Sequence, residues 1–189
     1  MHKSVLRTLL VMFLVPLAGA VAIHAQPQQK KQRPSEPQTE EKLAREVRHQ
    51  LILLPYYSVF DNLEFSVKND VVTLAGQVVR PTLKSDAEAT VKSIEGVAQV
   101  VNNIEVLPLS PNDDRLRRAL YRRIYGNPTL QQYSLQAVPP IHIIVKNGNV
   151  TLVGVVATEM EKNVAGISAN AVSGVFSVDN QLKVESKKN

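Results

Sequence analysis

An internal repeat constrains the fold of this chain more than any other feature of its sequence. Residues 67–76 read VKNDVVTLAG and residues 145–154 read VKNGNVTLVG, so seven of ten positions are identical at an offset of 78. The same offset relates three further pairs: Gly96 and Gly174, Val100 and Val178, and Asn102 and Asn180. Upstream the offset falls to 73, which places five extra residues of the second copy within residues 125–140. Because one offset is kept across separate motifs, the sequence predicts two copies of one small unit.

Each copy shows the same order of predicted helices and strands. In the first copy, hydrophobic spacing and turn residues predict a helix over 40–53, strands over 63–67 and 71–78, a helix over 82–94 and a last strand over 97–106. Thr39 is the predicted N-cap of the first helix, and Pro55 ends it. The same pattern in the second copy predicts helices over 113–125 and 159–172 and a last strand over 175–184. The turn of its first two strands contains Asn147 and Gly148, the preferred pair where both central residues need a positive φ.

The apolar faces of the predicted helices indicate how each unit packs. Leu43, Val47 and Leu51 recur at helical spacing in the first helix. The expected buried side of the second helix consists of Ala87, Val91 and Ile94 in one copy, and of Val164 with Ile167 or Ala171 in the other. We therefore predict an α+β fold of two tandem αββαβ domains, each a three-stranded sheet with two helices packed on one face.

The first 25 residues have the features of an export signal. Lys3 and Arg7 precede an apolar run over 9–23, and small residues suitable for signal peptidase follow it. We expect cleavage after Ala25, with cuts after Ala20 or Ala22 as alternatives. An uncleaved membrane anchor is the competing interpretation, but the run is shorter than the ~20 residues that span a bilayer, and it contains a proline. Residues 26–38 are rich in Gln, Pro and Lys and are predicted to form a disordered leader.

The chain contains no cysteine. Disulfides, thiolate metal sites, a thiol nucleophile and a lipoprotein anchor on cysteine are therefore excluded. We expect the mature protein to be soluble in the periplasm or secreted.

Two motifs in each copy resemble the BON domain family of bacteria. The first is V-x-L-x-G, at residues 72–76 and 150–154, and the second is G-V-x-x-V-x-N, at 96–102 and 174–180. The resemblance covers a first domain over 39–108 and a second over 112–186. It implies a non-catalytic module of the cell envelope that is linked to osmotic stress tolerance and attaches to phospholipid surfaces. Family members that are lipoproteins use a cysteine that this chain lacks.

No arrangement of side chains indicates catalysis. His49 and His142 are the two histidines outside the export signal, and both are interpreted as surface residues. Their spacing offers no metal site, and no cofactor motif is present. The acid pairs at residues 40–41, 113–114 and 159/161 lie at helix starts, where negative charge is favourable. The motif glycines are interpreted as structural: Gly76, Gly96, Gly154 and Gly174. The sequence predicts a protein that is not an enzyme.

Charge is distributed unevenly between the two copies. Residues 38–108 contain 7 basic and 10 acidic side chains, whereas residues 109–189 contain 10 basic and 6 acidic ones. Most of the basic excess lies on the helix predicted over 113–125. At 100° per residue, its three arginines at positions 115, 118 and 122 lie opposite the apolar side, and Tyr121 and Tyr125 border them.

Arginines beside tyrosines suit a layer of anionic lipid headgroups, since the cations attract phosphate and phenol rings settle at the interface. The candidate lipid-binding residues are Arg115, Arg118, Tyr121, Arg122 and Tyr125. A solvated helix face is the alternative interpretation. The lipid hypothesis fails if the other domain covers these arginines or pairs them with its carboxylates.

Three further functions compete with lipid attachment. The arginine row could contact an acidic protein partner in an assembly module of the periplasm, and glycan binding is a weaker option. A third interpretation is that the chain is a chaperone-like stress protein. Nucleic acid is not an expected partner of an exported chain with so small a net positive charge. No feature of the sequence indicates an oligomeric state.

Overall fold

The computed structural model describes residues 37–186, with side chains from residue 40 onward. The predicted signal peptide over 1–25 lies outside the described residues, as does most of the predicted leader over 26–38. The last two residues of that leader are helical, because the first helix already begins at Pro37.

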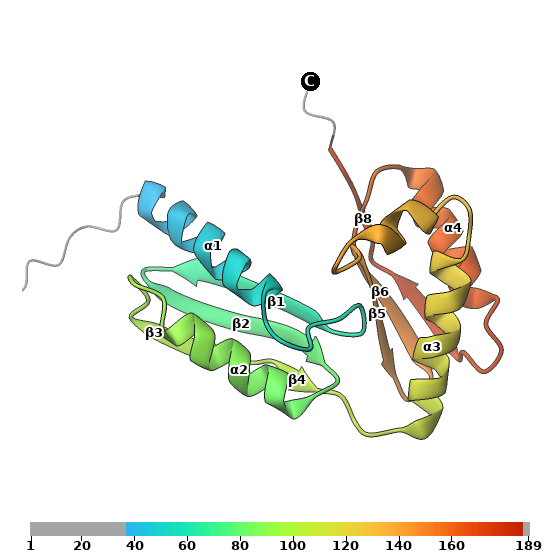
Figure 1. The fold of residues 1–189 in the computed structure, drawn as a ribbon, viewed down its shortest axis with the longest axis horizontal. Helices are drawn as coiled ribbons and strands as arrows, with labels where there is room; N and C mark the ends of the chain where they lie inside the picture. Colours follow the sequence, from blue (N-terminus) through green and yellow to red (C-terminus); the bar gives the residue numbers. More distant parts are fainter. Residues whose placement is uncertain (1–36, 187–189) are drawn as a thin grey trace, which may run out of the picture. The chain divides into compact units, whose positions relative to one another are not determined.

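The two sequence repeats fold into two domains with the same order of elements (Figure 1). The first contains α1 (Pro37–Ile52), β1 (Asn62–Lys68), β2 (Val71–Val78), α2 (Pro81–Lys92), β3 (Gln99–Asn102) and β4 (Glu105–Val106). The second contains α3 (Pro111–Tyr125), a short 3-10 helix η1 (Gln131–Leu135), β5 (Ile141–Lys146), β6 (Asn149–Val156), α4 (Glu159–Asn170), β7 (Ser177–Asn180) and β8 (Lys183–Val184). The element η1 accounts for most of the extra residues in the second copy.

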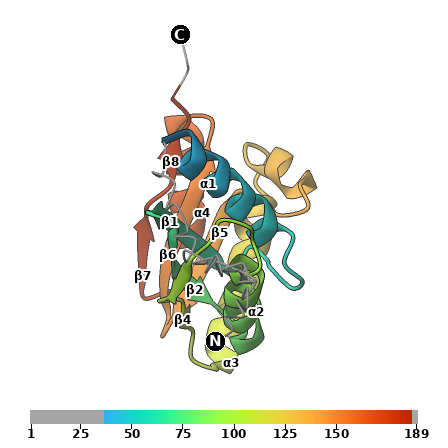
Figure 2. The ribbon, with the colours of Figure 1, turned by 90° about the vertical axis from the view of Figure 1, so that its left-hand side faces the viewer.

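Each domain is a small sheet with two helices on one face, which confirms the predicted α+β fold (Figures 1 and 2). β1 pairs with β2 antiparallel, and β2 pairs with β3 and β4 in parallel. β5, β6, β7 and β8 repeat this topology with the same register. Each domain has its own aliphatic core, which lies between the sheet and its helices.

The last strand of each domain is interrupted, although the sequence predicted one continuous strand. Asn102 and Asn180 end β3 and β7, and each side chain tethers the strand to the neighbouring helix. The amide of Asn102 donates to the Lys84 carbonyl at 3.0 Å, and that of Asn180 donates to the Lys162 carbonyl at 2.8 Å. Two residues later, Ile104 and Leu182 are each only 1% exposed. The interruption therefore turns an apolar side chain into each core.

The hairpin turns are built from residues with positive φ, as the sequence predicted for the second copy. Asn69 and Asp70 have φ of 49° and 61°, and Asn147 and Gly148 have φ of 52° and 77°. Both pairs therefore fit the mirror-image turn that matches the twist of the flanking strands.

Several predicted boundaries and one predicted face are wrong. α1 begins at Pro37, so Thr39 lies within its first turn and is not the N-cap. α2 and α4 each end two residues before the predicted end. Ile167 is 70% exposed and Ala171 is also exposed, whereas Ala165 and Ala169 are fully buried. The small side chains face the sheet because β7 approaches α4 closely; a Cβ at Gly166 would lie 2.8 Å from the Asn180 amide nitrogen.

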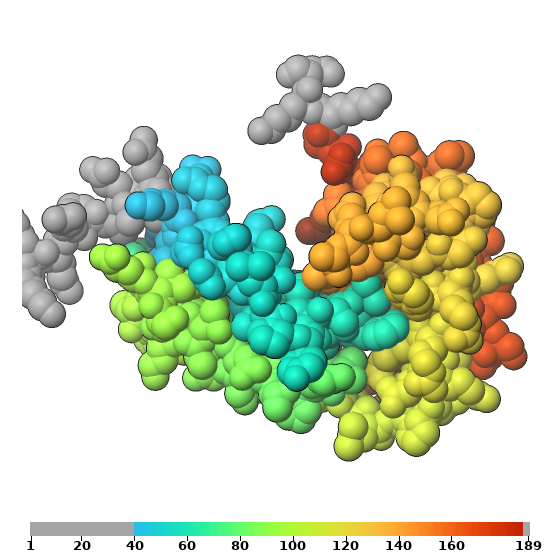
Figure 3. Space-filling view, viewed as in Figure 1, coloured from blue at the N-terminus to red at the C-terminus, as the bar shows by residue number. Residues whose placement is uncertain are grey.

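The segment between α1 and β1 packs against the second domain. The Ile143 backbone N–H donates to the Val59 carbonyl at 2.7 Å, and the Val59 side chain, 6% exposed, belongs to the second hydrophobic core. The Phe60 ring meets the Tyr121 ring of α3 edge to face, with centroids 6.3 Å apart. Figure 3 shows the teal atoms of this segment against the yellow atoms of the second domain.

Candidate functional site

Helix α3 positions the predicted lipid-binding residues, and local interactions fix where it begins. The hydroxyl of the N-cap residue Ser110 accepts a hydrogen bond from the Asp113 backbone N–H at 3.2 Å, and Pro111 occupies the first turn. The Asp113 carboxylate accepts hydrogen bonds from the backbone N–H groups of Asn147 and Gly148, both at 2.9 Å. Asp113 is 1% exposed and thus joins the start of α3 to the β5–β6 turn.

The buried side of α3 sets the direction of its arginines. Leu116, Leu120 and Ile124 are at most 1% exposed and face the second core. The side chains on the opposite side are exposed: Arg115, Arg118, Arg122 and also Arg123. We call these four the α3 arginine row. Arg123 was not among the predicted residues, because it lies 100° around the helix from Arg122, and the structure shows it to be exposed.

No carboxylate neutralises the α3 arginine row within residues 40–186. The guanidinium of Arg115 donates to the side-chain carbonyl of Asn112 at 2.7 Å, which is a neutral partner. The three ion pairs found in this range involve Arg45, Arg117 and Lys146. The four charges of the row therefore remain available to an anionic partner.

Arg117 is the one arginine of α3 that is buried, at 3% exposure. Its guanidinium forms an ion pair with Asp114 at 2.6 Å and donates to the Val145 carbonyl at 2.7 Å. Its Nε is buried without a partner in the described structure. These contacts give Arg117 a structural role, tying α3 to β5.

The two tyrosines of the predicted site are not exposed beside the arginines, as helical spacing predicted. Tyr125 is 4% exposed, and its hydroxyl donates to the Ile141 carbonyl at 2.5 Å. Its burial strongly raises the pKa of its phenol. Tyr121 is half-buried, with its ring 4.9 Å from that of Tyr125. Helical spacing misled here, because the first strand of the second domain and the Phe60 ring of the first cover this side of the helix end.

His142 is also not the surface residue that its alternation on the strand indicated. Its ring stacks on that of Tyr57 with centroids 5.6 Å apart, and its Nδ1 is buried without a partner in the described part of the chain. Burial lowers the pKa of His142, and the backbone of Asp61 and Ser58, followed by the Asp61 carboxylate, opposes this shift. The other histidine, His49, is exposed on α1 as predicted.

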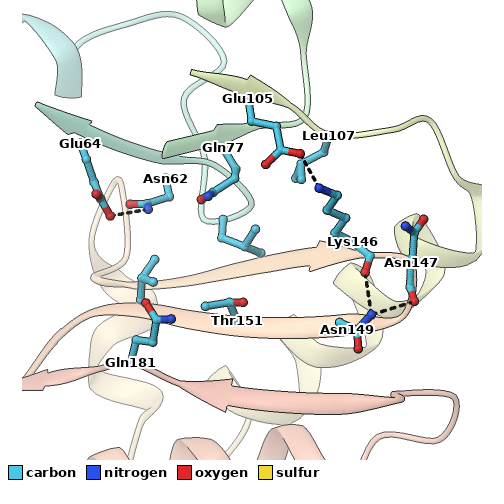
Figure 4. Close-up of a pocket in the computed structure, with 12 residues that line it drawn as sticks. Asn62, Glu64, Gln77, Glu105, Leu107, Lys146, Asn147, Asn149, Thr151 and Gln181 are labelled. Atoms are coloured by element: carbon cyan, nitrogen blue, oxygen red, sulfur yellow. Dashed lines mark hydrogen bonds and ion pairs between the residues drawn. The ribbon is translucent and has the colours of Figure 1, made fainter. Parts of the chain in front are cut away.

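A polar cleft of about 390 Å³ is the second candidate site (Figure 4). Residues of both domains line it, and the Lys146 ammonium pairs with the Glu105 carboxylate across it at 2.5 Å. Its other polar lining is mainly amide and carboxylate: Asn62, Glu64, Gln77, Asn147, Asn149 and Gln181. It brings together no histidine, serine or cysteine that could act as a nucleophile with a base.

The four motif glycines all have positive φ, between 93° and 127°. At Gly76 a Cβ would lie 2.1 Å from the Asn62 carbonyl oxygen, and at Gly154 a Cβ would lie 1.8 Å from that of Pro140. These two glycines are needed for the close approach of neighbouring strands.

Two other kinds of site are not formed by the described residues. Within residues 37–186, no group of three or more His, Asp or Glu side chains could hold a metal ion. None of the helices in this range has the length and apolar character needed to cross a bilayer.

Comparison with known proteins identifies the repeated unit. The sequence model of the BON domain matches residues 39–108 and 112–186. No curated protein matches the chain significantly. Two solved structures of CdsD, a structural protein of the type III secretion system of Chlamydia trachomatis, are similar to it. One has 12% identity and a TM-score of 0.32, and the match covers 78% of this chain and 94% of the chain in that structure. The other, of the CdsD C-terminal domain, has 14% identity and a TM-score of 0.27. This match covers 76% of this chain and 98% of the chain in that structure.

Proposed function

The chain belongs to the BON domain family, which is a non-catalytic family typical of envelope proteins, and we propose that it attaches reversibly to anionic phospholipid surfaces through helix α3. In this proposal, the attachment supports envelope integrity or stress tolerance. The protein is exported, is cleaved after Ala25 and acts in the periplasm or outside the cell.

The observation that supports lipid attachment is the exposed α3 arginine row. Four guanidinium groups project from one helix, and none is paired with a carboxylate among the described residues. The condition stated for rejecting the lipid hypothesis is therefore not met. Because Tyr125 is buried and Tyr121 is half-buried, the attachment depends on the arginines and not on aromatic rings at the interface.

The strength of this attachment follows from the number of charges. A basic residue near an anionic bilayer contributes about 1 kcal/mol. Four of them give about 4 kcal/mol, which corresponds to a dissociation constant of roughly 1 mM. Exposed charges are screened over about 8 Å at physiological salt, so the attachment is weak, reversible and sensitive to ionic strength.

Vesicle flotation tests the proposal with a charge-matched control. The mature chain is expected to float with vesicles containing phosphatidylglycerol and not with neutral phosphatidylcholine vesicles. The triple variant Arg115→Glu, Arg118→Glu, Arg122→Glu is expected to lose flotation. The control variant Lys42→Glu, Arg45→Glu, Lys92→Glu changes the net charge equally at exposed positions of the first domain and is expected to keep it. Equal flotation of both variants, or equal binding to neutral vesicles, rejects the proposal.

The competing functions give different outcomes. Envelope partners that stay bound after detergent removes lipid would support a protein-assembly module that uses the same arginines. Suppression of the aggregation of an unrelated protein, without any stable partner, would support a chaperone-like role. Export is tested separately by N-terminal sequencing of the protein from fractionated cells, where a mature chain that still begins at Met1 contradicts the proposed cleavage.

A further inference from the structure

A groove between α3 and β5 in the second domain is occupied by the first domain. Val59 inserts its side chain into the second core, and its carbonyl accepts the N–H of Ile143 on the outer edge of β5. Phe60 covers Tyr121 on the adjacent helix. The inward side chains of this edge strand, Ile141, Ile143 and Val145, are fully buried. Helix α3 contributes to this burial, since Tyr125 and Arg117 donate to the carbonyls of Ile141 and Val145.

The equivalent groove of the first domain, between α1 and β1, has no such occupant in the described structure. It has a volume of about 400 Å³ and is lined by Glu40, Glu41, Ala44, Arg48, Phe65, Ser66 and Val67. The repeat offsets of 73 and 78 place Arg48 and Phe65 at the positions of Tyr121 and Ile143. Correspondingly, Leu63, Phe65 and Val67 of β1 are only partly buried. Two features account for the difference in burial between the two edge strands. Val59 and Phe60 occupy the second domain alone, and Arg117 and Tyr125 of α3 bond to β5 at positions where α1 has Ala44 and Ile52.

The second domain contains a segment whose sequence matches the first-domain segment that fills the α3–β5 groove. Tyr57-Ser58-Val59 in the first domain matches Tyr133-Ser134-Leu135 in the second, at an offset of 76 that lies between those of the flanking elements. Val59 is 6% exposed, whereas Leu135 is 87% exposed.

The element that carries the exposed leucine is fastened to the second domain through Gln132 and Tyr133. The Tyr133 hydroxyl donates to the Glu161 carboxylate at 3.1 Å and accepts from the Ala157 N–H at 2.9 Å. Gln132 also donates to the Glu161 carboxylate at 2.8 Å. These bonds fasten η1 to the start of α4. Leu135 is therefore an apolar side chain on a fixed element, with no core of its own to enter.

We propose that Leu135 of one copy of this chain docks in the α1–β1 groove of a second copy, as Val59 docks in the α3–β5 groove within the chain. The contact joins two different surfaces, so each bound copy still offers one free Leu135 and one free groove. Such head-to-tail contacts produce rings or open chains, not closed twofold dimers. The proposal is independent of lipid attachment, because no residue of the α3 arginine row takes part.

Sedimentation of the mature chain over a range of concentrations tests this contact. The chain is expected to self-associate in solution without lipid. Leu135→Asp is expected to raise the dissociation constant at least about tenfold, since a buried leucine contact is replaced by a carboxylate. Leu109→Asp is the matched control, because Leu109 is 93% exposed and lies outside both surfaces. It is expected to associate as the native chain does.

Mixing two variants separates head-to-tail contact from other kinds of association. Ala44→Trp fills the groove and leaves Leu135 intact, whereas Leu135→Asp leaves the groove intact. Each variant alone is expected to be monomeric, and their equimolar mixture is expected to form a dimer and nothing larger. Thermal unfolding verifies that Ala44→Trp is folded, and Arg48→Asp provides a second groove variant.

Cysteine cross-linking gives a second readout, and the native chain contains no cysteine to interfere. Phe60 meets Tyr121 within the chain, and the corresponding positions between copies are Gln136 and Arg48. A mixture of Gln136→Cys and Arg48→Cys chains is expected to form a mixed disulfide more readily than either forms a disulfide with itself. A chain that stays monomeric at all concentrations, association that is unchanged in Leu135→Asp, or a mixture without dimer overturns the proposal.

Discussion

Replacement of Asp113 with alanine is expected to destabilise the second domain by about 3–7 kcal/mol. The buried carboxylate accepts two hydrogen bonds from the turn residues Asn147 and Gly148. Hydrogen bonds to a charged group contribute about 1.5–3 kcal/mol each. Its position in the first turn of α3 adds about 0.3–1 kcal/mol. Since Asp113 is only 1% exposed, water cannot readily replace the lost acceptor.

The repeat supplies a control for this prediction. Glu40 stands at the equivalent position of α1, and it accepts one hydrogen bond, from the Asn69 N–H at 2.9 Å. That bond is exposed, so Glu40→Ala is expected to cost only about 0.5–1.5 kcal/mol. Asp113→Asn keeps an acceptor oxygen without the charge and is expected to fall between the two alanine variants.

Urea unfolding followed by circular dichroism measures the loss of stability in each variant. Hydrogen exchange provides a local readout: the amides of Asn147 and Gly148 should exchange faster in Asp113→Ala, while that of Asn69 should be unaffected. If Asp113→Ala costs no more than Glu40→Ala, the buried carboxylate is not what fastens α3 to the β5–β6 turn, and the reasoning is refuted.

Two further predictions concern buried groups. Burial lowers the pKa of His142 below its ordinary 6.5, so the unfolded chain takes up a proton more readily and stability should fall as the pH drops below about 6.5. The urea midpoint is measured at pH 7.5 and at pH 5, and the difference between the two should be smaller in His142→Gln than in the native chain. The exposed His49→Gln should show the same difference as the native chain. If His142→Gln also shows the native difference, the prediction is wrong. Arg117→Ala breaks an ion pair whose arginine is buried and whose carboxylate, on Asp114, is half exposed. Because the remaining carboxylate can be solvated, we expect a cost near the lower end of the 3–5 kcal/mol typical of broken buried pairs, about 3 kcal/mol. The exposed Arg118→Ala should cost within about 0.5 kcal/mol in the same assay, and equal losses would show that burial of Arg117 is unimportant.

Features that depend on short-range spacing could be predicted from the sequence. The repeat offset, the bounds of β2 at Val71–Val78 and the positive φ at Asn147 and Gly148 follow from local pattern and turn chemistry. The outward direction of Arg115, Arg118 and Arg122 also follows from helical periodicity, because Leu116, Leu120 and Ile124 recur at helical spacing on the opposite side of α3.

Features that depend on a distant segment could not be predicted in this way. Helical periodicity places Tyr125 on the polar side of α3, yet its hydroxyl donates a hydrogen bond to the Ile141 carbonyl, 16 residues further along the chain. His142 alternates as a surface residue, yet Tyr57 of the first domain covers its ring. On α4, the buried face follows the small residues and not the largest apolar ones, since Asn180 requires a close approach. Periodicity identifies a face but does not reveal what later packs on it.

Val59 of the first repeat packs inside the core of the second repeat, so the two repeats are not structurally equivalent. A fragment that starts at the apparent boundary, near residue 109, lacks one side chain of its own interior and leaves the Ile143 N–H without an acceptor. The first repeat is synthesised earlier and can fold before the second, so the missing side chain is already in place when the later repeat emerges. Cutting the chain between its repeats therefore separates the second domain from a residue of its own core, although the internal repeat presents the two domains as separate units.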